Sequence, residues 1–152
     1  MSDTDRIEKQ LVLKAPRARV WRALTDDQEF GRWFGVALNQ RFTPGARIEG
    51  RITHPGYEHL PFTITIERIE PERLFAWRWH PHAIDPVADY SAEPTTRVEF
   101  ELAEVAGGTR LTIVESGFDG IPLARRLTAY RGNSSGWDQQ ARNIEAHVLA
   151  SL

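Results

Sequence analysis

The sequence predicts an α+β fold in which a curved antiparallel sheet of about seven strands is wrapped around one long C-terminal helix. Several central segments alternate apolar and polar residues, as half-buried strands do. A Pro-Gly turn and a glycine pair separate some of these segments, which is typical of hairpins in an antiparallel sheet. The last part of the chain carries one amphipathic stripe, so a single helix must cover the buried face of that sheet.

Length and composition indicate one domain of ordinary size over residues 1–152. The chain has no cysteine, which excludes disulfides and thiolate metal sites. Its 19 basic and 21 acidic residues give a net charge of −2, so we expect no nucleic-acid partner. The first ten residues lack the apolar core of a signal peptide, and no apolar run approaches the roughly 20 residues of a membrane span. We therefore expect a cytoplasmic protein.

The N-terminal part predicts one strand followed by two short helices. Residues 6–14 alternate and form the strand. Residues 16–25 form the first helix, because a first helical turn tolerates its leading proline. Thr25 and two aspartates suit the cap and first turn of the second helix, which ends at Gly35. The apolar stripe of that second helix consists of Phe30, Trp33 and Phe34, at i, i+3 and i+4.

Five further segments carry a strand pattern, and their apolar residues define the face that the C-terminal helix covers. They are ARIEGRIT (46–53), PFTITIERIE (61–70), RLFAWRW (73–79), TRVEFELAEV (96–105) and TRLTIVESGF (109–118). Alternation places Trp77 and Trp79 on the buried face and Arg78 on the wet face. Residues 80–94 contain three prolines and no clean period, which predicts a long loop.

The C-terminal helix is expected after Pro122, and one part of it is ambiguous. Its apolar stripe consists of Trp137, Ala141, Ile144, Val148 and Leu152. The segment GNSSG (132–136) allows two interpretations, because a glycine inside a helix costs about 1 kcal/mol relative to alanine. Either these residues form a loop or cap before Trp137, or the glycines thin one continuous helix where it faces a cavity.

Five segments span nearly the whole chain in an order that matches a known family. They are APRARVWRALTDDQEFGRWFG (15–35), FTPGARIEGRI (42–52), IERIEPERLFAWRW (66–79), GGTRLTIVESGF (107–118) and GWDQQARNIEAHV (136–148). Together they resemble the activator of heat-shock-protein-90 ATPase homologue family, within the START-like superfamily of helix-grip folds. The resemblance implies a seven-stranded sheet that grips the C-terminal helix, two short supporting helices, and a cavity between sheet and helix. Members of the superfamily mostly bind apolar or amphipathic small molecules, and some are cyclases or hydrolases.

We expect this cavity to bind an apolar or aromatic small molecule, with no cofactor or metal required. Trp77 and Trp79 face either this void or a filled core. Glu115 shares the inward face of its strand and is the expected polar anchor, unless the strand has ended and the carboxylate lies at a wet rim. Trp33 packs in the core or borders an entrance. The expected ligand-binding residues are Trp33, Phe62, Ile64, Trp77, Trp79, Phe100, Ile113, Glu115 and Trp137.

Two other functions stay open at this stage. A small cyclase or hydratase would use Glu115 with Arg78, His80 or Tyr130 as acid–base partners. A co-chaperone-like module that stimulates a chaperone ATPase would need an apolar patch on the convex face. The co-chaperone that gives the family its name carries an additional N-terminal domain, for which we expect no counterpart here. A chaperone partner is therefore less favoured than a small molecule, and binding is favoured over catalysis.

The histidines give no sequence signal for a metal site. His80, His82 and Asp85 superficially resemble metal ligands, but their spacing is the only support, and the local prolines obscure the geometry. We therefore expect no bound metal. The sequence leaves the oligomeric state open between a monomer and a homodimer.

Overall fold

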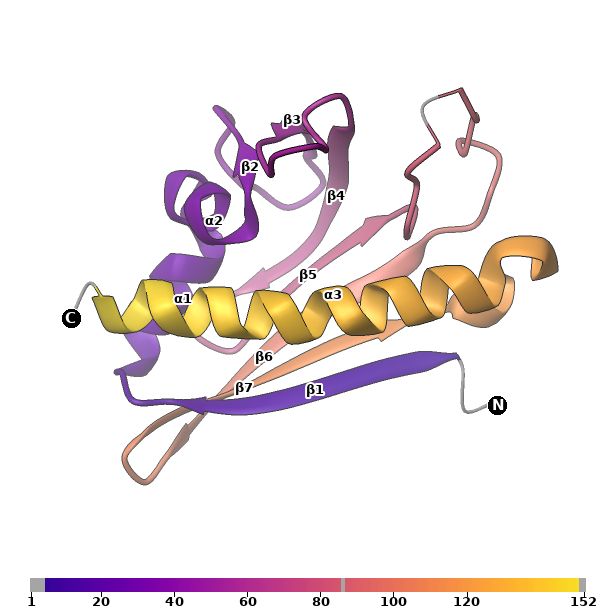
Figure 1. The fold of residues 1–152 in the computed structure, drawn as a ribbon. Coiled ribbons are helices and arrows are strands. Elements are labelled where there is room, and N and C mark those ends of the chain that lie inside the picture. The colour runs from indigo at the N-terminus through magenta and orange to yellow at the C-terminus, as the bar shows by residue number, and fades with distance from the viewer. Residues whose placement is uncertain (1–4, 86, 151–152) are drawn as a thin grey trace.

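A computed structural model describes residues 5–85 and 87–150. It contains one seven-stranded antiparallel sheet with strand order β1-β7-β6-β5-β4-β3-β2. The strands are β1 (Arg6–Leu13), β2 (Val36–Ala37), β3 (Arg47–Ile52), β4 (Pro61–Glu70), β5 (Leu74–Trp79), β6 (Thr96–Val105) and β7 (Gly108–Ser116). The helices are α1 (Arg17–Thr25), α2 (Asp27–Phe34), the 3-10 helix η1 (Phe118–Gly120) and α3 (Leu123–Ala150). The sheet curves around α3, with α1 and α2 beside the C-terminal half of that helix (Figure 1).

The predicted fold class is confirmed, and the alternation of side chains explains the sheet. In β4 the residues Phe62, Ile64 and Ile66 are buried, while the threonines between them are exposed. On the outward face Glu67 accepts from Arg78 at 2.9 Å, as alternation predicts for that arginine. The two-residue strand β2 was not predicted from the residue pattern, because two residues cannot display a period of two.

Helix α2 ends at Gly35 as predicted, but it is capped by Asp26, because Thr25 is the last residue of α1. The Asp26 side chain accepts from the backbone amides of Gln28 and Glu29, each at 3.0 Å, and caps the helix. Gly35 ends it with a φ of +91°, a left-handed conformation that glycine adopts without steric cost. This short helix brings Trp33 and Phe34 to the side of α3.

Helix α3 runs without interruption through residues 132–136, so the interpretation of a break before Trp137 is wrong. Contacts with other elements offset the weak helix propensity of this segment. Asn133 and Trp137 are hydrogen-bonded to a carboxylate of the sheet. A Cβ atom at Gly132 would lie 2.7 Å from the imidazole of His82, so any larger residue there would force that ring to shift. The stripe residue Leu152 lies outside the described residues.

Aromatic side chains fill the middle of the space between the sheet and α3. Trp77 is fully buried, and its ring centroid lies 5.1 Å from that of Phe100, 5.5 Å from Phe75 and 5.7 Å from Phe30. Its Nε1 atom has no hydrogen-bond partner among the described residues. Across the described parts of the chain, no helix is both long and apolar enough to cross a membrane.

Candidate functional site: a groove along the C-terminal helix

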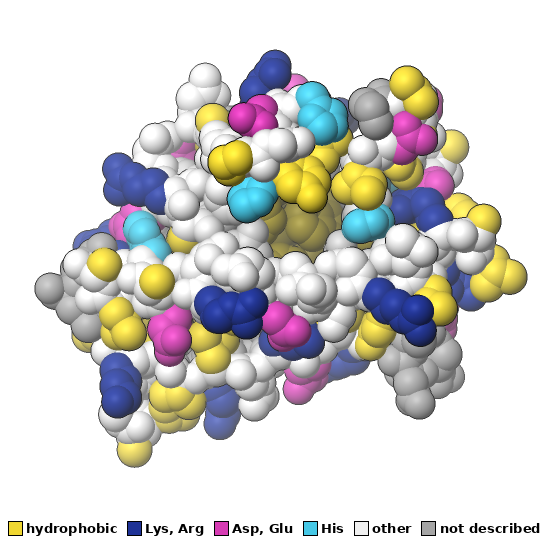
Figure 2. Space-filling model, viewed as in Figure 1, with side chains coloured by type: hydrophobic (Ala, Val, Ile, Leu, Met, Phe, Trp, Pro, Cys, Tyr) yellow, Lys and Arg dark blue, Asp and Glu magenta, His cyan; other side chains and the backbone are white. Residues whose placement is uncertain are grey.

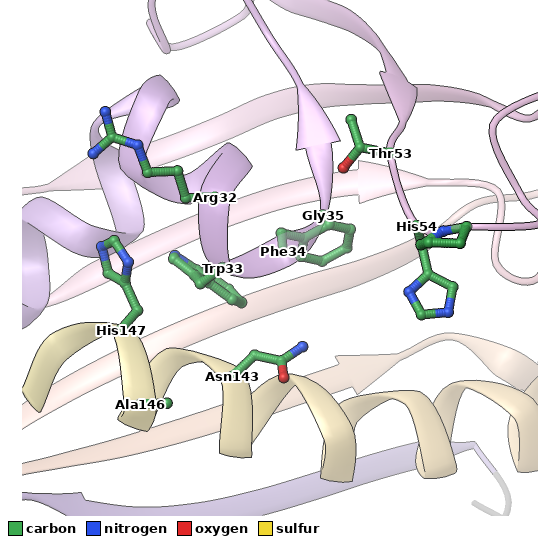
Figure 3. A pocket seen from close by; sticks show the side chains of 10 residues that line it. Arg32, Trp33, Phe34, Gly35, Thr53, His54, Asn143, Ala146 and His147 are labelled. Atoms are coloured by element: carbon green, nitrogen blue, oxygen red, sulfur yellow. The ribbon is translucent and has the colours of Figure 1, made fainter. Parts of the chain in front are cut away.

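Two neighbouring hollows lie between α3 and the elements packed above it. Figure 2 shows a recess between α3 and these elements, and the floor of the recess is apolar. The first, which we call the tryptophan hollow, has a volume of about 100 Å³. It is lined by Phe34, Trp79, Asn133, Gly136, Trp137 and Gln140. The second, which we call the polar hollow, has a volume of about 430 Å³. It is lined by Arg32, Trp33, Phe34, Gly35, Thr53, His54, Pro55, Asn143, Ala146 and His147 (Figure 3).

One face of α3 forms the helical wall of both hollows. The residues of this wall recur every three or four positions, so they lie along a single face of the helix. These residues are Asn133, Gly136, Trp137, Gln140, Asn143, Ala146 and His147. The Gln140 amide donates to the backbone carbonyl of Phe34 at 2.9 Å, which ties α3 to the end of α2. Both hollows share Phe34, so they adjoin each other beside this bond.

The Glu115 carboxylate lies behind the tryptophan hollow and is fully buried. Its Oε2 atom accepts from Trp79 Nε1 at 2.8 Å and from Thr96 Oγ1 at 2.5 Å. Its Oε1 atom accepts from Trp137 Nε1 at 2.8 Å. Asn133 Nδ2 lies 2.9 Å from Oε1 and 3.1 Å from Oε2. The side chain is therefore not at a wet rim, and its four donors come from β5, β6 and α3.

This carboxylate fixes the walls of the tryptophan hollow. Trp79, Asn133 and Trp137 all line the hollow, and all three donate to Glu115. Because an indole has one donor and no acceptor, each N–H bond fixes the orientation of its ring. The centroids of the Trp79 and Trp137 rings lie 6.0 Å apart, so the sheet and α3 touch directly here. The hollow is thus walled by two rings held in place.

The structure changes the expected set of lining residues. Phe62, Ile64, Trp77, Phe100 and Ile113 are buried and line neither hollow. These five residues belong to one continuous core of buried apolar side chains beneath the helix. These five residues form the core beneath the groove rather than its walls.

The remaining expected residues lie at or next to the groove. Trp79 and Trp137 line the tryptophan hollow, and Trp33 lines the polar hollow. Glu115 contacts the lining residues instead of lining a hollow itself. Sequence reasoning missed Asn133 and Gln140. Asn133 lies four residues before Trp137 and Gln140 three residues after it, so both lie on the same helical face as Trp137.

The predicted loop is fastened to the start of α3 by one arginine. Arg125 pairs with Glu93 at 2.6 Å and 2.9 Å and donates to the Pro81 carbonyl at 2.9 Å. Its guanidinium also lies 4.7 Å from the centroid of the Tyr90 ring. His82 packs over Gly132, one turn before Gly136 of the tryptophan hollow. In the described residues, no group of three or more His, Asp or Glu side chains could hold a metal ion.

Protonation of His82 is expected to loosen this loop. Burial, and then the charge of Arg125, hold the pKa of His82 below its ordinary value of 6.5, so the fold favours the neutral ring. The unfolded chain therefore takes up this proton first as the pH falls below 6.5, and the contribution of His82 to stability is lost between 6.5 and its lowered pKa.

Denaturant unfolding at pH 7.5 and pH 5.5 checks this expectation. His82 has a φ of +53°, which asparagine tolerates better than most residues, so His82→Asn is the matched variant. The native protein should lose more stability between the two pH values than His82→Asn does. Equal losses in both proteins would contradict the assigned role of His82.

Comparisons with known proteins agree on the fold. The family model described as "Activator of Hsp90 ATPase homolog 1-like protein" matches residues 14–148. No curated protein matches the chain. Protein MLL2253 from Mesorhizobium loti is 21% identical over 97% of this chain and 98% of its own, with a TM-score of 0.76. Protein NE0264 from Nitrosomonas europaea is 18% identical over 100% of this chain and 99% of its own, with a TM-score of 0.77.

A third solved structure is DynU16, a protein of the dynemicin biosynthetic locus. It is 22% identical to this chain, with a TM-score of 0.73. The match covers 97% of this chain but 48% of DynU16. At this level of identity the three structures establish a shared fold and nothing finer.

Proposed function

The chain belongs to the activator of Hsp90 ATPase homolog 1-like family, and we propose that its task is to bind a small apolar or aromatic molecule in the groove along α3. The bound group would lie in the tryptophan hollow, against the rings of Trp79 and Trp137. Apolar contact would supply most of the affinity, and the few polar groups of the groove would orient the molecule.

The observation that carries this proposal is the Glu115 carboxylate behind two ring walls. A buried carboxylate is costly unless hydrogen bonds compensate it, and apolar packing holds a core together without that cost. Here the compensating donors are the side chains that line the hollow. The arrangement keeps two flat apolar surfaces fixed beside open space. This favours binding, because the side chains lose little conformational entropy when a ligand arrives.

The size of the hollow limits the group that it can take. An apolar protein cavity of about 150 Å³ holds one benzene molecule. The tryptophan hollow, at about 100 Å³, is smaller than that cavity, so it suits a short branched chain or a single ring that is only partly enclosed. Larger ligands would need to extend along the groove toward the polar hollow.

Titration with 6-phenylhexanamide, a neutral single-ring probe, tests the proposal. At the ligand efficiency of drug-sized molecules its 14 heavy atoms supply about −4 kcal/mol, so we expect a dissociation constant of about 1 mM or tighter. Calorimetry or NMR shifts measure it. The absence of saturable binding at a probe concentration of about 10 mM would contradict the proposal.

The contacts of Glu115 favour binding over acid–base catalysis by this residue. Its four described donors are two indoles, a hydroxyl and an amide, and none of them gains or loses charge near neutral pH. The three residues expected as acid–base partners of Glu115 in an enzyme form their interactions with other groups. Arg78 pairs with Glu67, His80 contacts the Glu93 carbonyl, and the Tyr130 hydroxyl donates to the Arg6 carbonyl.

A further inference from the structure

We infer that the ligand of the groove is an amphipathic carboxylate, with its apolar group in the tryptophan hollow and its acid group in the polar hollow. This inference rests on the proposed function and adds the chemical class of the ligand. It depends on three features of the groove: the continuity of its two parts, the charge of the polar hollow, and the absence of unused donors in the tryptophan hollow.

The two hollows form a single binding path. They share Phe34, and between them lies the side-chain hydrogen bond from Gln140 to the Phe34 carbonyl. On α3 the path runs from Gly136 to Asn143. The seven steps between these two residues span about 10 Å at a rise of 1.5 Å per residue. A ring joined to an acid group by a chain of four or five methylene groups has this length.

The polar hollow is lined by cationic and neutral side chains. Its ten lining residues include Arg32, His54 and His147, and none of them is Asp or Glu. Arg32 is exposed and makes no hydrogen bond or ion pair with any described residue. In Figure 3 the ring of His54 points toward α3 and Asn143 lies across the hollow from it, whereas the guanidinium of Arg32 extends away from α3. The lining therefore contains no carboxylate that would repel an anion, and Arg32 can pair with an acid group at the exposed rim of the hollow.

The carboxylate nearest to this lining is already bound by cations. Glu29 Oε1 accepts from Arg19 at 2.8 Å and contacts His147 Nε2 at 2.9 Å, and Glu29 Oε2 accepts from Arg22 at 2.8 Å. These bonds hold the pKa of Glu29 below its ordinary value, although burial acts in the opposite direction as the largest single influence. Arg32 lies three residues after Glu29 on α2 and is not among the groups that bind it.

The tryptophan hollow offers no comparable place for an acid group. The indole N–H groups of Trp79 and Trp137 are both donated to Glu115, as is the amide of Asn133. A second carboxylate placed there would find these donors in use and would lie close to the carboxylate of Glu115. The acid group is therefore directed to the Arg32 end of the groove and the apolar group to the tryptophan end.

A pair of probes that differ only in charge tests this inference. At pH 7.5 the carboxylate of 6-phenylhexanoate is ionised, and 6-phenylhexanamide is its neutral counterpart. We expect the native protein to bind the acid about fivefold more tightly than the amide, the upper range for an exposed charge pair. Arg32→Gln should reduce this advantage to less than twofold. Arg110→Gln, on the exposed face of β7, is the control and should keep the full advantage.

The outcomes separate the inference from the proposed function. Equal affinities for acid and amide in the native protein would overturn the inference and leave the proposed function standing. An advantage that survives in Arg32→Gln would also overturn it, because the acid group would then be recognised by a group other than Arg32. Failure of the amide to bind would contradict the proposed function itself.

Discussion

Replacement of Glu115 by glutamine is expected to lower the free energy of unfolding by about 2 kcal/mol, although only one oxygen becomes an NH2 group. If the NH2 replaces Oε2, it faces the N–H of Trp79; if it replaces Oε1, it faces the N–H of Trp137. Thr96 and Asn133 can reverse their hydrogen bonds, but an indole N–H cannot accept. One buried indole donor is therefore left without a partner in either orientation.

Chemical denaturation measures this effect, and thermal unfolding should show a decrease in Tm of about 6 °C for a chain of this length. Glu145→Gln is the matched control, because Glu145 is exposed on α3 and is not among the hydrogen-bond partners of Glu115. It should change the stability by less than about 0.5 kcal/mol. A Glu115→Gln protein as stable as the native one would show that the four hydrogen bonds do not fix the tryptophan walls.

Replacement of Gly136 by leucine is expected to reduce the affinity for 6-phenylhexanamide at least about tenfold without unfolding the protein. A Cβ atom at this position meets no atom within 4 Å, so the new side chain enters open space in the tryptophan hollow. Leucine is also a better helix former than glycine by nearly 1 kcal/mol, so the stability should stay equal or rise by about that amount.

The control for this change is Ser135→Leu. Ser135 is the preceding residue of α3, is exposed, and lines neither hollow. It adds the same side chain to the same helix and should leave the affinity within about twofold of the native value. Unchanged affinity in Gly136→Leu, with the fold intact, would place the ligand outside the tryptophan hollow.

Local sequence signals predicted the fold because each of them acts within a few residues. The cap at Asp26, the glycine that ends α2 and the alternation along β4 depend on neighbours in the chain. Alternation also placed Glu115 on the inward face. It could not identify the four donors, because they come from β5, β6 and α3 and lie up to 36 residues away in sequence.

The shape of the groove depended on features that alternation does not encode. Trp77 and Trp79 have the same parity, yet Trp77 lies at the centre of the core and Trp79 lines the hollow. Whether aromatic rings fill a space depends on side-chain volumes from several elements at once. Likewise, Gly132 and Gly136 look alike in sequence, but His82 covers the first while open space adjoins the second.

The position of a bound ring relative to the tryptophans tests the central claim most directly. The chain has five tryptophans, so a nitrogen–proton correlation spectrum contains five indole signals. On titration with 6-phenylhexanamide, the signals of Trp79 and Trp137 should move together and saturate, with little change for Trp21 on α1. Gly136→Leu should abolish these shifts. Saturable binding that leaves the Trp79 and Trp137 signals in place would contradict the claim that the tryptophan hollow is the ligand site.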